Sequence, residues 1–149
     1  MGERPLGPPR RRAEPPVEVG SRGWFEAYLA AFNRSDFAAF GAYYADDVEF
    51  AGQAGSFAGA AAVIAFYREV KARVDETLTL LSFIGDGVRI AAELHTSIVA
   101  RQDWPEFPTG AMRAGDRRES TNFIFYDIAG GRFVRIRSAN FRRSGLIPA

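Results

Sequence analysis

The segment that most constrains the fold is residues 24–50, WFEAYLAAFNRSDFAAFGAYYADDVEF, because it reads as two short amphipathic helices that run directly into a strand. Within it, apolar or aromatic residues recur at helical spacing: Trp24, Tyr28, Ala31 and Phe32, then Phe37, Phe40, Gly41 and Tyr44. Both helices therefore need a common apolar partner from later in the chain. This pattern predicts a cone-shaped α+β fold that encloses a pocket.

The composition predicts one folded domain behind a disordered tail. The chain has 149 residues, 47% of them apolar, which is enough for one core and too little for two comfortable ones. Residues 1–20 contain five of the eight prolines and a run of three arginines, Arg10 to Arg12, with few large apolar side chains. Such a segment cannot bury enough surface to order itself. We therefore expect a Pro/Arg-rich tail over 1–20 and a single domain over 21–149.

Charge and residue usage exclude several function classes. The net charge of +1 gives no general reason to expect nucleic acid or an acidic membrane as a partner. The chain has no cysteine and one histidine, so we expect no metal site. No apolar run approaches the ~18 residues that a membrane span needs, and the chain begins without a secretory signal pattern. A cytoplasmic protein without a cofactor is the default expectation.

The rest of the chain supplies the partner for the first two helices. Residues 59–74 read as a third amphipathic helix, and residues 77–84 and 88–100 read as two strands joined by an Asp86-Gly87 turn. Two further strands are expected near 117–127 and 132–141. The expected order is ααβαββββ. Three N-terminal helices on one face of a curved antiparallel sheet would leave a cavity between the two layers.

This order and three short motifs resemble a known family. The segment EAYLAAFNRSD…YYADDVEF, the pair His95-Thr96 and the triplet Pro108-Thr109-Gly110 are similar to those of the SnoaL-like polyketide cyclases and ketosteroid isomerases, in the nuclear transport factor 2-like superfamily. The resemblance covers about residues 24–141. It implies a cofactor-independent isomerase, cyclase or dehydratase that acts by proton transfer on an apolar, carbonyl-containing molecule of steroid, terpenoid or polyketide type. The alternative is a non-catalytic ligand-binding or dimeric accessory domain of the same fold.

The resemblance implies roles for two tyrosines. Tyr28 matches the tyrosine that donates a hydrogen bond to the enolate oxygen in ketosteroid isomerases, and Tyr67 matches a tyrosine that supports it. A neutral phenol in a dry cavity can stabilise negative charge that develops on a carbonyl oxygen. In the alternative interpretation both tyrosines are core residues with their hydroxyls bonded to backbone or water. Aromatic periodicity does not decide between the two.

The catalytic acids of the related enzymes are missing from the matching positions. The isomerase's base falls on Gly52 and its second oxyanion donor near Thr121. The acid on the closing strand of limonene epoxide hydrolases falls near Ser138. The acidic partner of the catalytic histidine in the dehydratase-like branch falls at Asn33. No subgroup's full catalytic set is therefore present.

His95 is the leading candidate for a general base, because a histidine side chain ordinarily titrates near neutrality. Glu93 and Ser97 share its strand face by the two-residue period, so either Glu93 would orient it or Ser97 would bond to it. The same period raises an objection, since Leu94 and Ile98 belong to the more apolar face, which should turn toward the helices. A β-bulge would shift the register midway and bring His95 inward. Both orientations stay open at this stage.

The resemblance also predicts the pocket wall. Beside Trp24, Phe50, Tyr67 and Glu93, it is expected to include Thr121, Phe123 and Phe125 from one closing strand and Ser138 and Asn140 from the next. Such a wall, mostly aromatic with a few hydroxyl and amide groups, suits a small apolar molecule as ligand. The outer face of the sheet is expected to pair with a second copy of the chain, giving a homodimer.

Overall fold

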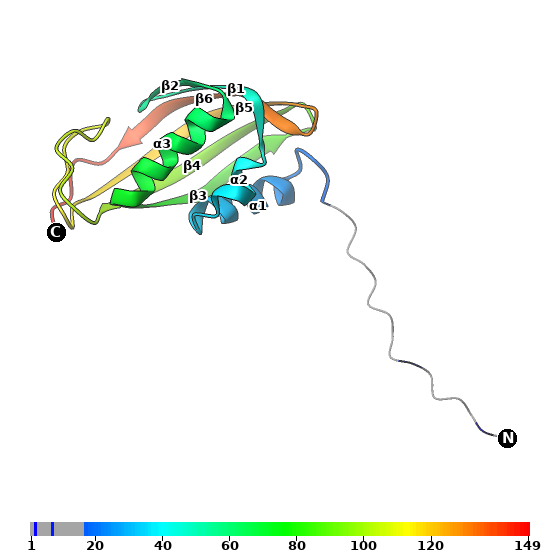
Figure 1. Cartoon of the computed structure of the whole chain (residues 1–149), viewed down its shortest axis with the longest axis horizontal. Helices are drawn as coiled ribbons and strands as arrows, with labels where there is room; N and C mark the ends of the chain where they lie inside the picture. The colour runs from blue at the N-terminus through cyan, green and yellow to red at the C-terminus, as the bar shows by residue number, and fades with distance from the viewer. Residues whose placement is uncertain (1, 3–6, 8–16) are drawn as a thin grey trace.

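A computed structural model describes residues 2, 7 and 17–149 of the chain, so most of the predicted tail lies outside the described residues. Figure 1 shows three helices, α1 (Arg22–Asn33), α2 (Phe37–Gly41) and α3 (Ala60–Arg73), gathered against one sheet. The strands, in chain order, are β1 (Tyr44–Gly52), β2 (Gly55–Ala58), β3 (Val74–Gly85), β4 (Arg89–Ala100), β5 (Arg117–Ala129) and β6 (Arg132–Arg143). In the part of the chain that the structure describes, no helix is both long and apolar enough to cross a bilayer.

The first two helices begin where the sequence supplies capping side chains. The hydroxyl of Ser21 accepts a hydrogen bond from the backbone N–H of Trp24 at 3.2 Å, and the carboxylate of Asp36 accepts one from Ala39 at 3.0 Å. Both caps satisfy a backbone donor that the first helical turn leaves unpaired. The helix α1 then buries one aromatic face, including Phe25, Tyr28 and Phe32. The predicted helices are thus confirmed.

The sheet has six strands in the order β2-β1-β6-β5-β4-β3, with β2 and β3 at its open edges. The α+β fold with N-terminal helices on a curved sheet is confirmed. Two details differ from the prediction. The short strand β2 follows β1 through a turn and was not predicted, and β1 pairs with β6 in parallel, so the sheet is mixed and not purely antiparallel.

The core lies between the helices and the concave face of the sheet. It is unusually aromatic: Phe25, Phe32, Phe40, Tyr44 and Phe133 are all almost fully buried. Burying such rings supplies most of the driving force for a domain of this size. A smaller cluster under the loop between β4 and β5 contains Val70, Val74, Ala100, Trp104, Phe107 and Met112. The two clusters leave room between them for a cavity.

The last residues of the predicted tail belong to the folded part. The backbone N–H of Ser21 bonds to the carbonyl oxygen of Glu18 at 3.0 Å, and Gly20 adopts a positive φ of 82°. A β-carbon at Gly20 would collide with the backbone of Asp86 in the β3–β4 turn. This close approach requires glycine at position 20. Gly20 therefore packs against the β3–β4 turn of the folded domain.

Candidate functional site

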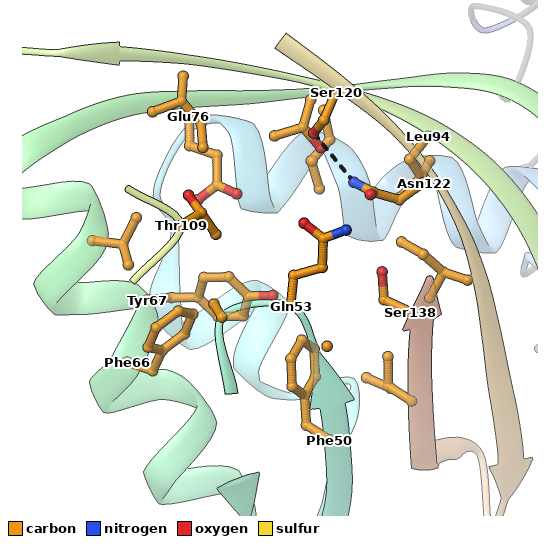
Figure 2. A pocket seen from close by; sticks show the side chains of 18 of the residues that line it. Phe50, Gln53, Phe66, Tyr67, Glu76, Leu94, Thr109, Ser120, Asn122 and Ser138 are labelled. Atoms are coloured by element: carbon orange, nitrogen blue, oxygen red, sulfur yellow. Dashed lines mark hydrogen bonds between the residues drawn. The ribbon is translucent and has the colours of Figure 1, made fainter. Parts of the chain in front are cut away.

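A cavity of about 140 Å³ lies between the helices and the concave face of the sheet. This is much more than the roughly 10–15 Å³ that one water molecule needs. Apolar and aromatic side chains form most of its wall, many of them from α3 and from β4 to β6, as Figure 2 shows in part. Its polar lining is made mainly of hydroxyl and amide groups, from Gln53, Thr96, Thr109, Ser120, Asn122 and Ser138. The cavity suits a compact apolar molecule with a few oxygen atoms.

His95 does not reach this cavity. Leu94, Thr96 and Ile98 line it, and His95 lies between them on the opposite face of β4, where its side chain is 34% exposed. Its Nε2 atom is 4.0 Å from a carboxylate oxygen of Glu119 on the same outer face. The pairing of β4 with β5 runs without a register shift from Arg89 to Val99, so no bulge turns the strand over. The predicted placement of His95 in the pocket is therefore wrong.

Glu93 lies on the outer face with His95, because residues two apart on a strand share a face. Its carboxylate accepts a hydrogen bond from the hydroxyl of Ser82 at 3.1 Å and does not line the cavity. The only register shift beside this part of β4 is in β3, between Leu80 and Ser82. The bulge that we expected exists on the neighbouring strand, where it cannot redirect the side chains of β4.

The strand β5 faces the other way from the prediction. Ser120, Asn122 and Ile124 line the cavity, so Thr121, Phe123 and Phe125 point outward. The side chains of Phe123 and Phe125 are 45% and 47% exposed. Both faces of this strand carry apolar side chains, and alternation alone therefore could not decide which face is buried.

The remaining predicted wall residues have mixed outcomes. Phe50, Tyr67 and Ser138 line the cavity as expected. Asn140 lines a more open hollow at its mouth, and its amide donates to the side-chain oxygen of Asn122 at 2.9 Å. Trp24 lies away from the cavity, where it packs against the rings of Tyr43 and Phe133.

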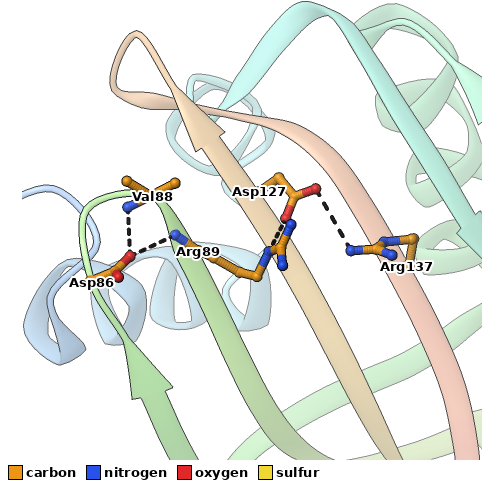
Figure 3. Close-up of polar contacts among 5 residues, drawn as sticks. All are labelled: Asp86, Val88, Arg89, Asp127 and Arg137. Carbon is orange, nitrogen blue, oxygen red and sulfur yellow. Dashed lines mark hydrogen bonds and ion pairs between the residues drawn. The ribbon is translucent and has the colours of Figure 1, made fainter.

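The outer face of the sheet carries a separate network of ion pairs and hydrogen bonds, shown in Figure 3. Arg89 of β4 lies 2.6 Å from a carboxylate oxygen of Asp127 on β5, and Arg137 of β6 lies 3.7 Å from the other oxygen. Asp86 accepts hydrogen bonds from the backbone of Val88 and Arg89 at the start of β4. These contacts tie three strands together on the side opposite the cavity.

Tyr28 lines the cavity, and its hydroxyl lies 2.7 Å from the hydroxyl of Tyr44. Burial raises the pKa of both phenols, so both stay neutral at any physiological pH. The hydroxyl partner of Tyr28 is thus Tyr44 and not Tyr67. The helical spacing had placed Tyr44 on the apolar face of the second helix, whereas the structure places it at the start of β1. Tyr67 lines the same cavity, and burial also raises its pKa.

Glu76 is the acidic side chain that the sequence analysis missed. It lines the cavity from β3, and its Oε2 atom is buried with no hydrogen-bond partner in the described part of the protein. Burial raises the pKa of this carboxyl to about 7, although the charge of Lys71 acts in the opposite direction. The charge of Glu76 in turn helps to raise the pKa of Tyr28 and of Tyr67. The carboxyl and the two phenols therefore share one electrostatic environment.

Two polar side chains hold the helices over the strand that carries Glu76. The ammonium group of Lys71 donates to the carbonyl oxygen of Phe32 at 2.7 Å, and it lies 4.0 Å from the centre of that ring. The side chain of Asn33 bonds both the N–H and the C=O of Leu78, at 2.8 and 2.9 Å. Asn33, where the related dehydratases place an acid, thus anchors α1 to β3.

The chemistry available in the cavity is proton transfer and hydrogen bonding. Among residues 2, 7 and 17–149, no three histidine, aspartate or glutamate side chains converge as metal ligands would. The wall offers one carboxyl with a buried oxygen, a set of neutral donors, and the guanidinium groups of Arg118 and Arg143. This arrangement can accept a proton, return it, and stabilise an oxygen atom that becomes negative in between.

Fold and cavity together define a small α+β pocket protein, and comparison with known proteins gives its family. A family model described as a SnoaL-like domain matches residues 25–136. The protein belongs to this SnoaL-like family. No curated protein matches the chain.

Solved structures of several related kinds share the fold. A protein of Xanthomonas campestris pv. campestris, provisionally named a polyketide cyclase, is 26% identical over 78% of this chain and 86% of its own, with a TM-score of 0.63. An LEH-like epoxide hydrolase of M. tuberculosis is 17% identical over 78% of each chain, with a TM-score of 0.62. A provisionally named ketosteroid isomerase of Kribbella flavida is 18% identical over 86% of this chain and 82% of its own, with a TM-score of 0.60. The last two are similar in fold alone.

Proposed function

We propose that this protein is a cofactor-independent enzyme that moves a proton within an apolar, carbonyl-containing molecule, as an isomerase does, or that forms the same enolate so that it attacks a second carbonyl carbon of the substrate and closes a ring, as a cyclase does. Glu76 is the general base in this proposal, and Tyr28 is the donor to the carbonyl oxygen. The observation that carries it is the buried oxygen of Glu76, which has no hydrogen-bond partner among the described residues and lies in the wall of the cavity that Tyr28 also lines. A steroid-, terpenoid- or polyketide-like ring compound is the substrate class that the apolar wall suits best.

The proposed reaction needs no further reagent. The carboxylate of Glu76 removes a proton from the carbon next to the carbonyl group, and the electron pair of that C–H bond forms the enolate. The hydroxyl of Tyr28 donates a hydrogen bond to the enolate oxygen while the negative charge is there. Glu76 then returns the proton to the same carbon or to another carbon of the conjugated system, which breaks the enolate and restores the carbonyl group.

The pKa of Glu76 supports its role. A general acid and base works best when its pKa lies near the operating pH, because both protonation states are then populated. Burial brings the pKa of Glu76 to about 7, close to neutrality. The bond between Tyr28 and Tyr44 adds to this, because a Tyr44 hydroxyl that donates to Tyr28 leaves the Tyr28 proton for the ligand.

Exchange with heavy water tests the proposal without knowledge of the natural product. The protein is incubated in D₂O with 2-tetralone, a compact bicyclic ketone, and with a steroid enone, and deuterium at the carbons next to the carbonyl is followed by mass spectrometry. We expect exchange above the buffer rate, and a loss of about 100-fold or more in Glu76→Gln. Glu93→Gln, an acid on the outer face, is the matched control and should keep the full rate. Equal exchange in Glu76→Gln and wild type would refute the role of Glu76.

A non-catalytic ligand-binding domain is the second candidate, and one observation favours it. The cavity positions where related enzymes place acids carry Gly52 and Ser138, neither of which can transfer a proton in this role. In this case the ring compounds should raise the melting temperature of the protein by binding to the folded state. Binding of both ketones without any deuterium exchange would support this candidate and contradict the enzymatic one.

A further inference from the structure

The mouth of the cavity carries two arginines on its inner side. Arg118 near the start of β5 and Arg143 at the end of β6 both line the cavity. Arg143 pairs across the sheet with Ser120, which places Arg118 diagonally beside it on the same face. Diagonal neighbours of this kind lie roughly 7–8 Å apart, within reach of two long side chains. The two guanidinium groups can therefore address one ligand group together.

These arginines lack the acidic partners that several other arginines of the described part of the protein have. Among the described residues, neither Arg118 nor Arg143 has a carboxylate oxygen within 4.0 Å. Arg118 makes only two long hydrogen bonds, 3.3 Å each, to the hydroxyl of Thr109 and the carbonyl oxygen of Gly110. By contrast, Arg89, Arg101 and Arg22 each lie 2.6 Å from an acid. Among the described residues, no carboxylate therefore neutralises the two positive charges at the mouth.

The surroundings make an anion favourable there. Desolvation lowers the pKa of Arg118, and the neighbouring charge of Arg143 lowers it further, although the charge of Asp116 acts in the opposite direction. Two like charges beside an apolar cavity repel each other, and an anion between them would remove that repulsion. An arginine also presents its N–H groups in a planar fork that matches the two oxygens of a carboxylate.

The mouth is also open to a ligand. A second, shallower hollow is lined by Gln53, Pro108, Thr109, Asn140 and Arg143. Gln53, Thr109 and Arg143 belong to both this hollow and the cavity, so the two are continuous. Figure 2 shows the side chain of Gln53 reaching into the same space from the β1–β2 turn. A ligand can therefore place its head group at the arginines while its body lies inside.

We infer that the ligand of this protein is an amphiphilic carboxylic acid, with its apolar ring body in the cavity and its carboxylate bound by Arg118 and Arg143. This deepens the proposed function, since it names the substrate class for the same cavity. It also relates the anion site to Glu76. Both Glu76 and Arg118 pair with Ile98, one from each side, so their backbones lie about 10 Å apart, two strand spacings. A carboxylate held at the arginines therefore leaves the body of the ligand on the side of Glu76.

A pair of isosteric probes tests the inference by binding alone. 2-Naphthoic acid and 2-naphthamide have the same shape and differ in charge at pH 8. By calorimetry at low salt, we expect the acid to bind at least about tenfold more tightly than the amide, because charge-assisted hydrogen bonds are the stronger kind. Added sodium chloride should reduce this preference. An acid that binds no better than the amide, or that does not bind at all, would overturn the inference.

The neighbouring arginines provide matched controls. Arg117 and Arg142 adjoin the two arginines in sequence but lie on the outer face, where Arg117 is 3.8 Å from Glu119 and Arg142 lies over the ring of Phe141. The variants Arg118→Gln and Arg143→Gln should each lose most of the preference for the acid. Arg117→Gln and Arg142→Gln should keep it. A preference that survives in the double variant of Arg118 and Arg143 would contradict the site.

Two further measurements separate this inference from its alternatives. Acetate should compete poorly with 2-naphthoate, because it has no ring body; equal competition would reduce the site to a general anion contact and overturn the inference. The Glu76→Gln variant should keep the preference for the acid, since the arginines carry it. One outcome would contradict the proposed catalysis and still support the ligand class. In it, the wild type shows no deuterium exchange but prefers the acid, and the Arg118 and Arg143 variants lose that preference.

Discussion

The hydroxyl groups of Tyr28 on α1 and Tyr44 at the start of β1 lie 2.7 Å apart in the buried centre of the protein. The two hydroxyls share one hydrogen bond, so each phenol has a partner where water is scarce. The pair also joins the first helix to the sheet on the side of the cavity. Its loss should therefore change both the stability of the fold and the strength of Tyr28 as a donor.

A double-mutant cycle measures this pair. Tyr44→Phe should lower the free energy of unfolding by about 1–3 kcal/mol, because it leaves the Tyr28 hydroxyl buried without a partner. Tyr28→Phe should cost a similar amount, and the double variant should cost clearly less than the sum of the two. Urea unfolding checks the energies, with Tyr43→Phe, a half-buried neighbour, as the control. Strictly additive losses would show that the two hydroxyls do not interact.

Removal of the Tyr28 hydroxyl should also slow proton exchange. A single hydrogen-bond donor to an oxyanion is worth about 100-fold or more in rate. Tyr28→Phe is therefore expected to reduce deuterium exchange into 2-tetralone by about that factor. Tyr44→Phe should reduce it less, because the Tyr28 hydroxyl is still present. A Tyr28→Phe variant with the wild-type rate would remove Tyr28 from the mechanism.

Glu76 should make stability depend on pH in an unusual direction. Burial raises its pKa from 4.5 to about 7, so between these values the folded protein holds a proton that the unfolded chain has lost. The contribution of Glu76 to the free energy of unfolding is therefore greatest below pH 4.5 and is lost as the pH rises through 7. Since one pKa unit corresponds to about 1.4 kcal/mol, the loss is at most about 3.5 kcal/mol, and water in the cavity reduces it.

The Glu76→Gln variant isolates this contribution. It keeps the shape of the side chain without a titrating group, so the part of the pH dependence between pH 5 and 8 that Glu76 causes should disappear. Urea unfolding at both pH values checks this, with Glu93→Gln on the outer face as the control. The prediction is contradicted if wild type and Glu76→Gln show the same difference in unfolding free energy between pH 5 and pH 8.

The fold was accessible from sequence because its signals are local. Helical spacing in residues 24–50 and the Asp86-Gly87 turn fixed the helices and the central hairpin. The parallel pairing of β1 with β6 joins strands that are far apart in the chain and leaves no local pattern. The four-residue strand β2 is too short for alternation to indicate it.

The site was harder to predict, since it depends on which face of each strand turns inward. On β4 the apolar residues Leu94 and Ile98 indicated the inner face correctly, while the suitability of a histidine for proton transfer had favoured an inward His95. Glu76 had a usable signal: it stands two residues from both Val74 and Leu78 and so belongs to the buried face of β3. An acid at such a position is costly unless it has a role. Because the strand was expected to begin only at Thr77, Glu76 was not considered as one of its residues.

Replacing His95 tests directly whether this residue lies outside the site. Because it lies on the outer face of β4, His95→Gln should leave deuterium exchange at the wild-type rate and change binding of 2-naphthoate less than twofold. Thr96→Ala, on the inner face one residue away, is the comparison and should change binding of the ring compounds. A loss of exchange in His95→Gln with the fold intact would mean that the outer face takes part in the reaction.

The exposed outer face leads to the last prediction. Phe123, Phe125 and Phe141 are 45%, 47% and 51% exposed, and the rings of Phe123 and Phe141 lie 5.0 Å apart. Around them stand charges of both signs, including the Arg89–Asp127 pair. An apolar patch with mixed charges beside it can pair with a copy of itself across a twofold axis. We propose that this face forms a homodimer.

Sedimentation and light scattering check this proposal. Wild type should sediment as a dimer, and Phe123→Glu should dissociate it by placing a charge in the apolar centre of the contact. Leu146→Glu changes an equally exposed apolar residue outside the sheet and should leave the dimer intact. Because the cavity opens on the other side of the sheet, dissociation should leave the binding of 2-naphthoate within about twofold of wild type. A monomeric wild-type protein, or a dimeric Phe123→Glu variant, would contradict pairing through this face.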